Sequence, residues 1–130
     1  MKRNELRTVL YVDDEPDIRE VVEMSLALVD GLQVHTCDSG ERALLEVQHV
    51  RPDLVLLDVM MPGMDGPETL ARLRELPSAA RIPVVFMTAK ALPQELEQFT
   101  RLGAVGVIAK PFDPMRLGEQ LLAIWDKVPP

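Results

Sequence analysis

The chain has 130 residues, of which 47% are hydrophobic and 27% are charged, and this composition is typical of one globular domain. Its formal net charge of -7 argues against direct binding to nucleic acid or to anionic lipid, and favours a metal cation or a basic partner surface. The lone Cys37 excludes an intramolecular disulfide, and no apolar run approaches the roughly 20 residues of a membrane span, so we expect a cytoplasmic protein without a signal sequence.

Apolar runs that suit buried strands alternate along the chain with stretches in which apolar residues recur at helical spacing. In chain order we predict strands over residues 8–12, 32–36, 54–57, 82–87 and 105–109, each followed by a helix, over 18–28, about 39–47, 67–76, 92–102 and 113–125. Asp113 would cap the last helix and Pro114 would be its first residue. This alternation predicts one α/β domain over 1–130, ordered from about 6 to 127, in which helices cover both faces of a parallel sheet.

Polar residues follow four of the five predicted strands, at the point where each strand ends. Asp13 and Asp14 follow the first strand, Asp58 the third, Thr88 the fourth and Lys110 the fifth. In open α/β sheets, functional sites form beyond the carboxyl ends of the strands. We therefore expect three carboxylates, a hydroxyl and an ammonium group to lie together at this edge of the sheet.

These residue types suit a magnesium-dependent phosphoryl site. Crowded carboxylates repel one another, and a hard divalent cation such as Mg²⁺, which prefers oxygen ligands, removes that conflict. A phosphoryl group can then join the site, with Lys110 as a positive charge and the Thr88 hydroxyl as a hydrogen-bond donor. Asp58 directly follows four apolar residues and is the candidate nucleophile for an aspartyl-phosphate.

Each of these residues also has a structural interpretation when it is taken alone. Asp13 and Asp14 could cap the first helix, which has Pro16 in its first turn. Thr88 could simply begin a helix, and Lys110 could be a solvated surface residue. Their joint occurrence at four strand ends favours the phosphoryl site.

Four segments of the chain resemble the receiver domain of bacterial two-component response regulators. The matching segments are YVDDE at 11–15, LLDVMMPGMDG at 56–66, MTA at 87–89 and AKPF at 109–112. The resemblance covers nearly all of the chain. It implies a flavodoxin-like (βα)5 fold with a five-stranded parallel sheet in the strand order 2-1-3-4-5.

The resemblance also implies a role for each acidic residue. Asp58 would be the phosphoacceptor. Asp14 and Asp58 would bind Mg²⁺ directly, the backbone carbonyl of Met60 would supply a third protein ligand, and Asp13 would act mainly through water.

The resemblance has three further implications, which concern residues at the ends of the fourth and fifth strands. Thr88 and Lys110 would bind the phosphoryl oxygens, and the Lys110–Pro111 peptide bond would be cis. Val107 stands where receivers usually carry Tyr or Phe, three residues before the lysine. The large aromatic rotation of the family is therefore not expected in this chain.

The function implied is a phosphoacceptor switch in a two-component phosphorelay, which takes its phosphoryl group from a sensor histidine kinase or a histidine phosphotransfer protein. Beyond its own Mg²⁺-dependent phosphorylation and slow dephosphorylation, we expect no enzyme activity. Effector docking or homodimer formation would use the surface of the fourth helix, fifth strand and fifth helix.

Alternative interpretations are a receiver fragment of a longer regulator, and a degenerate receiver that binds partners without phosphorylation. A phosphatase of the haloacid-dehalogenase type is disfavoured, because Met60 stands where a second Asp is required. A flavodoxin is disfavoured because the acidic residues 13–15 would repel a flavin phosphate.

Overall fold

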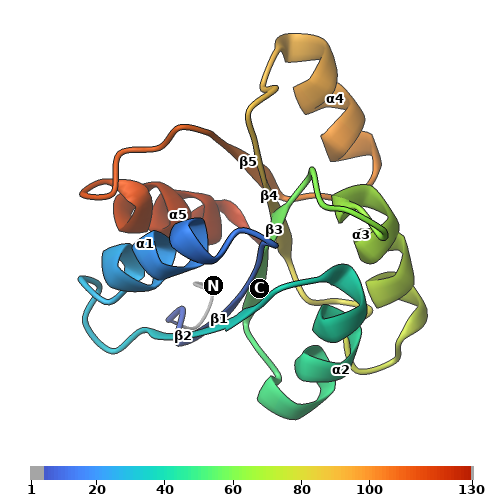
Figure 1. Cartoon of the computed structure of the whole chain (residues 1–130), viewed down its shortest axis with the longest axis horizontal. Helices are drawn as coiled ribbons and strands as arrows, with labels where there is room; N and C mark the ends of the chain where they lie inside the picture. Colours follow the sequence, from blue (N-terminus) through green and yellow to red (C-terminus); the bar gives the residue numbers. More distant parts are fainter. Residues whose placement is uncertain (1–4, 130) are drawn as a thin grey trace.

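Five parallel strands form the centre of the protein, in the order β2-β1-β3-β4-β5, and helices cover both faces (Figure 1). The computed structural model describes residues 5–129; residues 1–4 and 130, at the ends that we predicted to be loose, lie outside the described residues. The elements are β1 Thr8–Val12, α1 Pro16–Leu26, β2 Gln33–Cys37, α2 Gly40–Val50, β3 Leu54–Asp58, α3 Gly66–Glu75, β4 Val84–Thr88, α4 Pro93–Arg101, β5 Gly106–Ala109 and α5 Leu117–Lys127. The fold class is the one that the sequence pattern predicted, and the strand order is the one that the resemblance to receiver domains implied.

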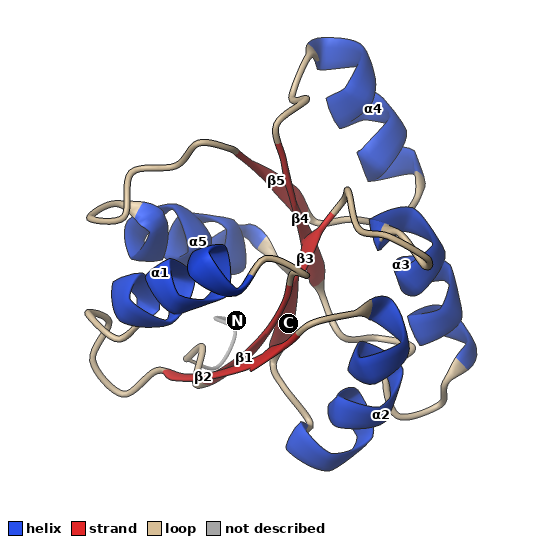
Figure 2. Ribbon diagram, viewed as in Figure 1, coloured by secondary structure: helices blue, strands red, loops and turns tan. Residues whose placement is uncertain are grey.

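The sheet separates two apolar cores. Helices α1 and α5 cover one face and α2, α3 and α4 cover the other (Figure 2). Successive side chains of a strand point to opposite faces, so Tyr11 and Leu56 belong to the α1/α5 core while Leu10 and Leu57 belong to the opposite one. Burial on both faces explains why β1 and β3 are almost continuously apolar.

Strands β3 and β4 each end one residue later than predicted, and this residue is a site residue in both strands. Asp58 is the last residue of β3 and Thr88 is the last residue of β4. The ladder continues past both of them, because Val59 N donates to Met87 O at 3.0 Å and Lys110 N donates to Thr88 O at 2.8 Å. The backbone around both side chains is therefore fixed by the sheet.

The predicted start of the last helix was wrong. Asp113 and Pro114 lie in a turn, where the Asp113 carboxylate accepts a hydrogen bond from Met115 N at 2.9 Å, and α5 begins only at Leu117. Asp113 thus closes a turn that leads into the helix, instead of capping the helix itself. The first helix begins and ends two residues earlier than predicted, since α1 runs from Pro16 to Leu26 instead of from residue 18 to residue 28.

Asp13 and Asp14 do not cap the first helix. The N-cap residue of α1 is Glu15, which makes no side-chain cap bond, and Pro16 is the first helical residue. The capping interpretation of the two aspartates is therefore wrong. Among residues 5–129, no helix has the length and apolar character that crossing a membrane requires.

Candidate functional site

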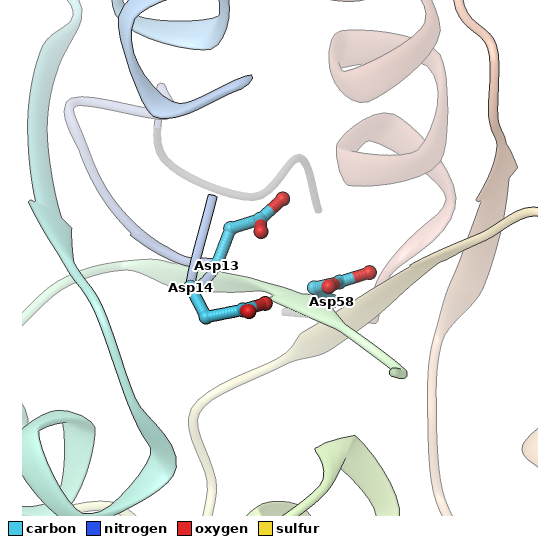
Figure 3. Close-up of side chains that lie close together, drawn as sticks. All are labelled: Asp13, Asp14 and Asp58. Atoms are coloured by element: carbon cyan, nitrogen blue, oxygen red, sulfur yellow. The ribbon is translucent and has the colours of Figure 1, made fainter. Parts of the chain in front are cut away.

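Three carboxylates converge at the carboxyl edge of the sheet, as predicted. Asp13 and Asp14 directly follow β1, Asp58 ends β3, and the two strands pair with Val12 opposite Leu57. One carboxylate oxygen from each aspartate can be chosen so that all three lie within 4.8 Å of one another. The three side chains project into one space from two adjacent strand ends (Figure 3).

Lys110 bridges two of these carboxylates. Its Nζ lies 3.1 Å from Asp13 Oδ2 and 3.1 Å from Asp58 Oδ1, and its side chain is only 18% exposed. Burial opposes the positive charge, but the hydrogen bonds to Asp58 and Asp13 outweigh it and raise the pKa of Lys110. The Lys110–Pro111 peptide bond is cis, which confirms the expectation drawn from the resemblance.

Asp58 is held in an environment that disfavours its ionised form. It is 3% exposed, and burial, followed by repulsion from Asp13, raises its pKa to about 6 although Lys110 acts in the opposite direction. Asp58 is therefore mostly ionised at neutral pH, and protons compete for it in mildly acidic solution.

Gly66, the first residue of α3, allows that helix to begin directly against Asp58. Its backbone N–H donates to Val59 O at 2.9 Å. A Cβ atom at this position would come within 2.6 Å of Asp58 O and 2.8 Å of Val59 Cα. Because a side chain cannot fit there, a glycine is needed to keep the loop after β3 close to its strand.

The neutral variant Asp58→Asn should stabilise the metal-free protein at neutral pH, by about 1–3 kcal/mol. The pKa of Asp58 is about 6 in the folded protein against an ordinary 3.8, so folding favours the protonated carboxyl. The contribution of Asp58 to wild-type stability is therefore greatest at a pH below its ordinary pKa of 3.8, and it is lost as the pH rises through about 6. The free energies of unfolding of the wild type and of Asp58→Asn, measured with urea in the presence of chelator at a series of pH values, should diverge over this range. A difference that does not change with pH would contradict the assignment.

Asp13 is fixed by contacts that the sequence did not indicate. Its Oδ1 accepts from Glu15 N at 2.9 Å, and its Oδ2 accepts from the Tyr11 hydroxyl at 2.5 Å as well as from Lys110. Its backbone carbonyl accepts from Arg19 Nη1 at 2.8 Å. The Tyr11 contact could have been found from the period of two in a strand, which puts residues 11 and 13 on one face.

Thr88 and Met60 lie at the same edge of the sheet but do not contact the carboxylates through hydrogen bonds of their side chains. Thr88 is buried, and its Oγ1 accepts from Lys90 N at 3.0 Å, which leaves the hydroxyl hydrogen available for donation. Met60 lies two residues beyond Asp58, and this residue is 68% exposed.

A pair of phenylalanine rings lies in the same core as Val107, which occupies the position of the missing family aromatic. Val107 is half-buried, stands opposite Phe86 in the β4–β5 pair, and packs into the core under α2, α3 and α4. The rings of Phe86 and of Phe99, from α4, have centroids 5.0 Å apart. Aromatic packing at this place therefore links β4 with α4, and residue 107 contributes only a short aliphatic group.

An apolar hollow of about 390 Å³ adjoins the acidic cluster, and Lys110 forms part of its wall. The other lining residues are Ile18, Val21, Ala89, Pro111, Phe112 and Pro114. They come from α1 and from the loops that follow β4 and β5. The hollow thus offers an apolar surface next to a charged site.

The donor set of the cluster fits a hard divalent cation. All three candidate ligands are carboxylates, and one lysine charge cannot neutralise three carboxylates. A cation such as Mg²⁺ prefers oxygen ligands and would balance the remaining negative charge. The residues present can therefore hold a metal, and with a metal they can accommodate an anionic phosphoryl group.

Comparison with known proteins gives consistent matches. The family model of the response regulator receiver domain matches residues 9–122. The phosphate regulon transcriptional regulatory protein PhoB of Pseudomonas aeruginosa is 34% identical over 124 residues, which are 95% of this chain and 54% of that protein. The regulatory protein AtoC of Escherichia coli is 36% identical over 108 residues, which are 83% of this chain and 23% of that protein.

The solved structure of the chemotaxis response regulator CheY4 of Vibrio cholerae matches with a TM-score of 0.83 and 32% sequence identity. The match covers 92% of this chain and 99% of that one. The match thus extends over nearly all of the solved CheY4 chain, whereas this chain spans only about half of PhoB and about a quarter of AtoC.

Proposed function

The chain belongs to the response regulator receiver domains of two-component systems, and on this basis we propose that it is a phosphoacceptor switch with Asp58 as its nucleophile. The observation that carries the proposal is the position of Asp58. It ends the central strand, shares Lys110 with Asp13 at 3.1 Å, and lies within 4.8 Å of both other carboxylates. Incubation with acetyl phosphate and Mg²⁺ should add one phosphoryl group per chain, measured as intact-protein mass.

The proposed reaction is an in-line displacement at phosphorus. An Asp58 carboxylate oxygen attacks the phosphorus of a phosphohistidine, the P–N bond breaks, and the imidazole leaves with the electron pair, so that an acyl phosphate forms. Lys110, already adjacent to Asp58, would pair with the phosphoryl oxygens, and the Thr88 hydroxyl would donate to one of them.

Asp14 and Asp58, with the Met60 carbonyl, are the proposed protein ligands of Mg²⁺, and Asp13 would contribute mainly through water. When bound, the ion would offset the carboxylate charge and polarise the phosphoryl oxygens. We propose no catalytic activity beyond the protein's own phosphorylation and dephosphorylation.

The proposed donor is a sensor histidine kinase or a histidine phosphotransfer protein, acting in the cytoplasm. We propose that this donor packs against the apolar hollow that Lys110 shares with Ile18 and Phe112, because the hollow adjoins the acidic cluster. Apolar side chains there can be buried by a partner helix without separating charges from water. The complete set of acidic, hydroxyl and lysine residues favours this function over a receiver that only binds.

The output is proposed to use the surface of α4, β5 and α5, whether by effector docking or by homodimer formation. Leu92, Leu96, Leu102 and Val105 are exposed at α4 and at the start of β5. Because the chain covers only part of several relatives, an effector domain elsewhere in a longer protein fits the same proposal.

Phosphorylation should change amide exchange mainly in α4 and in the loops on either side of it. Thr88 leads into α4 and Lys110 follows β5, so a phosphoryl group that binds both would shift their loops. Phe99 would pass this shift to α4 through its contact with Phe86. Exchange measured with and without beryllofluoride should differ most over residues 89–105. Changes limited to α1 and α2 would be inconsistent with this mechanism.

The phosphorylated protein should lose its phosphoryl group slowly, and Met60→Asn should accelerate the loss severalfold. Hydrolysis needs a water aligned opposite the leaving Asp58 oxygen, and the apolar Met60 side chain cannot hold one. Met24→Asn on α1 is the matched control, because its side chain is 67% exposed against 68% for Met60. Equal decay of the Met60 variant and the wild type would show that this side chain does not set the lifetime.

A further inference from the structure

Tyr11, the one tyrosine of the chain, lies against the acidic cluster. It is a β1 residue with 0% exposure, and its side chain shares a face of the strand with Asp13. Its hydroxyl donates to Asp13 Oδ2 at 2.5 Å. The other acceptor nearby is Met87 Sδ at 3.6 Å, and a thioether is a weak acceptor. The hydroxyl hydrogen is therefore committed to the carboxylate.

The other donors to Asp13 differ from Tyr11 in an important way. Glu15 N, which donates to Oδ1, belongs to the local backbone. Lys110, which donates to Oδ2, is shared with Asp58 and would also have to bind a phosphoryl group. Among residues 5–129, Tyr11 is thus the side-chain donor whose hydrogen bond to Asp13 is not shared with the reacting groups.

We propose that Tyr11 is a positioning residue for the metal site, and that its hydroxyl holds the Asp13 carboxylate in the orientation in which the three aspartates bind a divalent cation. The inference rests on the proposed function, because it assumes that the acidic cluster binds Mg²⁺. Groups that orient metal ligands commonly change metal affinity by roughly 10–100-fold when they are removed.

The variant Tyr11→Phe isolates the hydroxyl, since the ring and its packing are retained. Calorimetric titration of the full chain with Mg²⁺ should give an affinity about tenfold weaker than that of the wild type. Ser25→Ala is the control. Ser25 also donates through a buried hydroxyl, to Pro114 O, but it lies in the last turn of α1, at the opposite end of that helix from Asp13. Its Mg²⁺ affinity should equal that of the wild type.

A second measurement separates positioning from packing. If Tyr11 acts through Asp13, the Tyr11→Phe change should have no further effect in an Asp13→Asn background. A tenfold loss that persists in that background would overturn the proposal, because the hydroxyl would then act on something other than the carboxylate.

The tyrosine also provides its own signal. Protein made with Cζ-labelled tyrosine should give one NMR resonance, since the chain has one tyrosine. This resonance should shift on addition of Mg²⁺, and the Mg²⁺ concentration that gives half of the shift should agree with the affinity measured by calorimetry. The resonance should not shift in Asp13→Asn. If the wild type binds no Mg²⁺, the proposed function fails and this inference fails with it. If the wild type binds Mg²⁺ and Tyr11→Phe binds it equally well, only this inference is overturned.

Discussion

Asp58→Asn should take up no detectable phosphoryl group from acetyl phosphate. Its initial labelling rate should be at least about a hundredfold below that of the wild type. The asparagine amide keeps the size of the side chain but has no anionic oxygen that can attack phosphorus. Asp13 is not expected to replace it, because both of its oxygens already accept hydrogen bonds, from Glu15 N, Tyr11 and Lys110. Intact-protein mass spectrometry over a time course in Mg²⁺ measures the effect.

The matched control is Asp126→Asn, which removes one exposed carboxylate from α5. This variant has the same overall charge as Asp58→Asn, and it should be labelled like the wild type because Asp126 is not part of the acidic cluster. Labelling of Asp58→Asn at the wild-type rate would show that another residue is the acceptor.

Removal of divalent cations should abolish labelling of the wild type, and added Mg²⁺ should restore it. Three carboxylates with one lysine leave a net negative charge at the site, and a phosphoryl dianion would add to it. The variant Asp14→Ala should weaken Mg²⁺ binding most, because Asp14 is a proposed direct ligand and, among residues 5–129, no hydrogen-bond donor occupies its carboxylate.

The experiment compares labelling rates in chelator, in chelator with excess Mg²⁺, and in Mg²⁺ alone. A labelling rate that is unchanged by the chelator would exclude the metal from the reaction. Asp14→Ala protein that binds Mg²⁺ as tightly as the wild type would exclude Asp14 as a ligand, and would leave the phosphoacceptor assignment to Asp58 intact.

The position of the site could be predicted from the sequence because it depends on strand ends. In a parallel sheet the residue after each apolar run lies at the same edge, so the sequence alone places Asp13, Asp58 and Lys110 together. The structure adds the geometry, in which one Lys110 ammonium contacts both carboxylates at 3.1 Å.

Other features could not be predicted, because they depend on tertiary packing. The predicted start of α5 was wrong because Asp113 and Pro114 suit a turn as well as a helix start. In the structure they form a turn, and the helix begins at Leu117, which is buried in the core. The exposure of Met24 could not be read from apolar spacing, since the face that a helix buries depends on its neighbours. The Tyr11–Asp13 contact is different, because the period of two in a strand already places both residues on one face, and the structure adds only the hydrogen bond of 2.5 Å.

The central claim is that the phosphoryl group forms an acyl phosphate on Asp58, and chemical reduction of that bond tests it most directly. Borohydride converts the side chain of an aspartyl-phosphate to that of homoserine and leaves free carboxylates unchanged. After treatment with acetyl phosphate and Mg²⁺, peptide mass spectrometry should find homoserine at position 58 and aspartate at positions 13 and 14. Homoserine at position 13 or 14, or phosphate retained on a hydroxyl such as Thr88, would contradict the account.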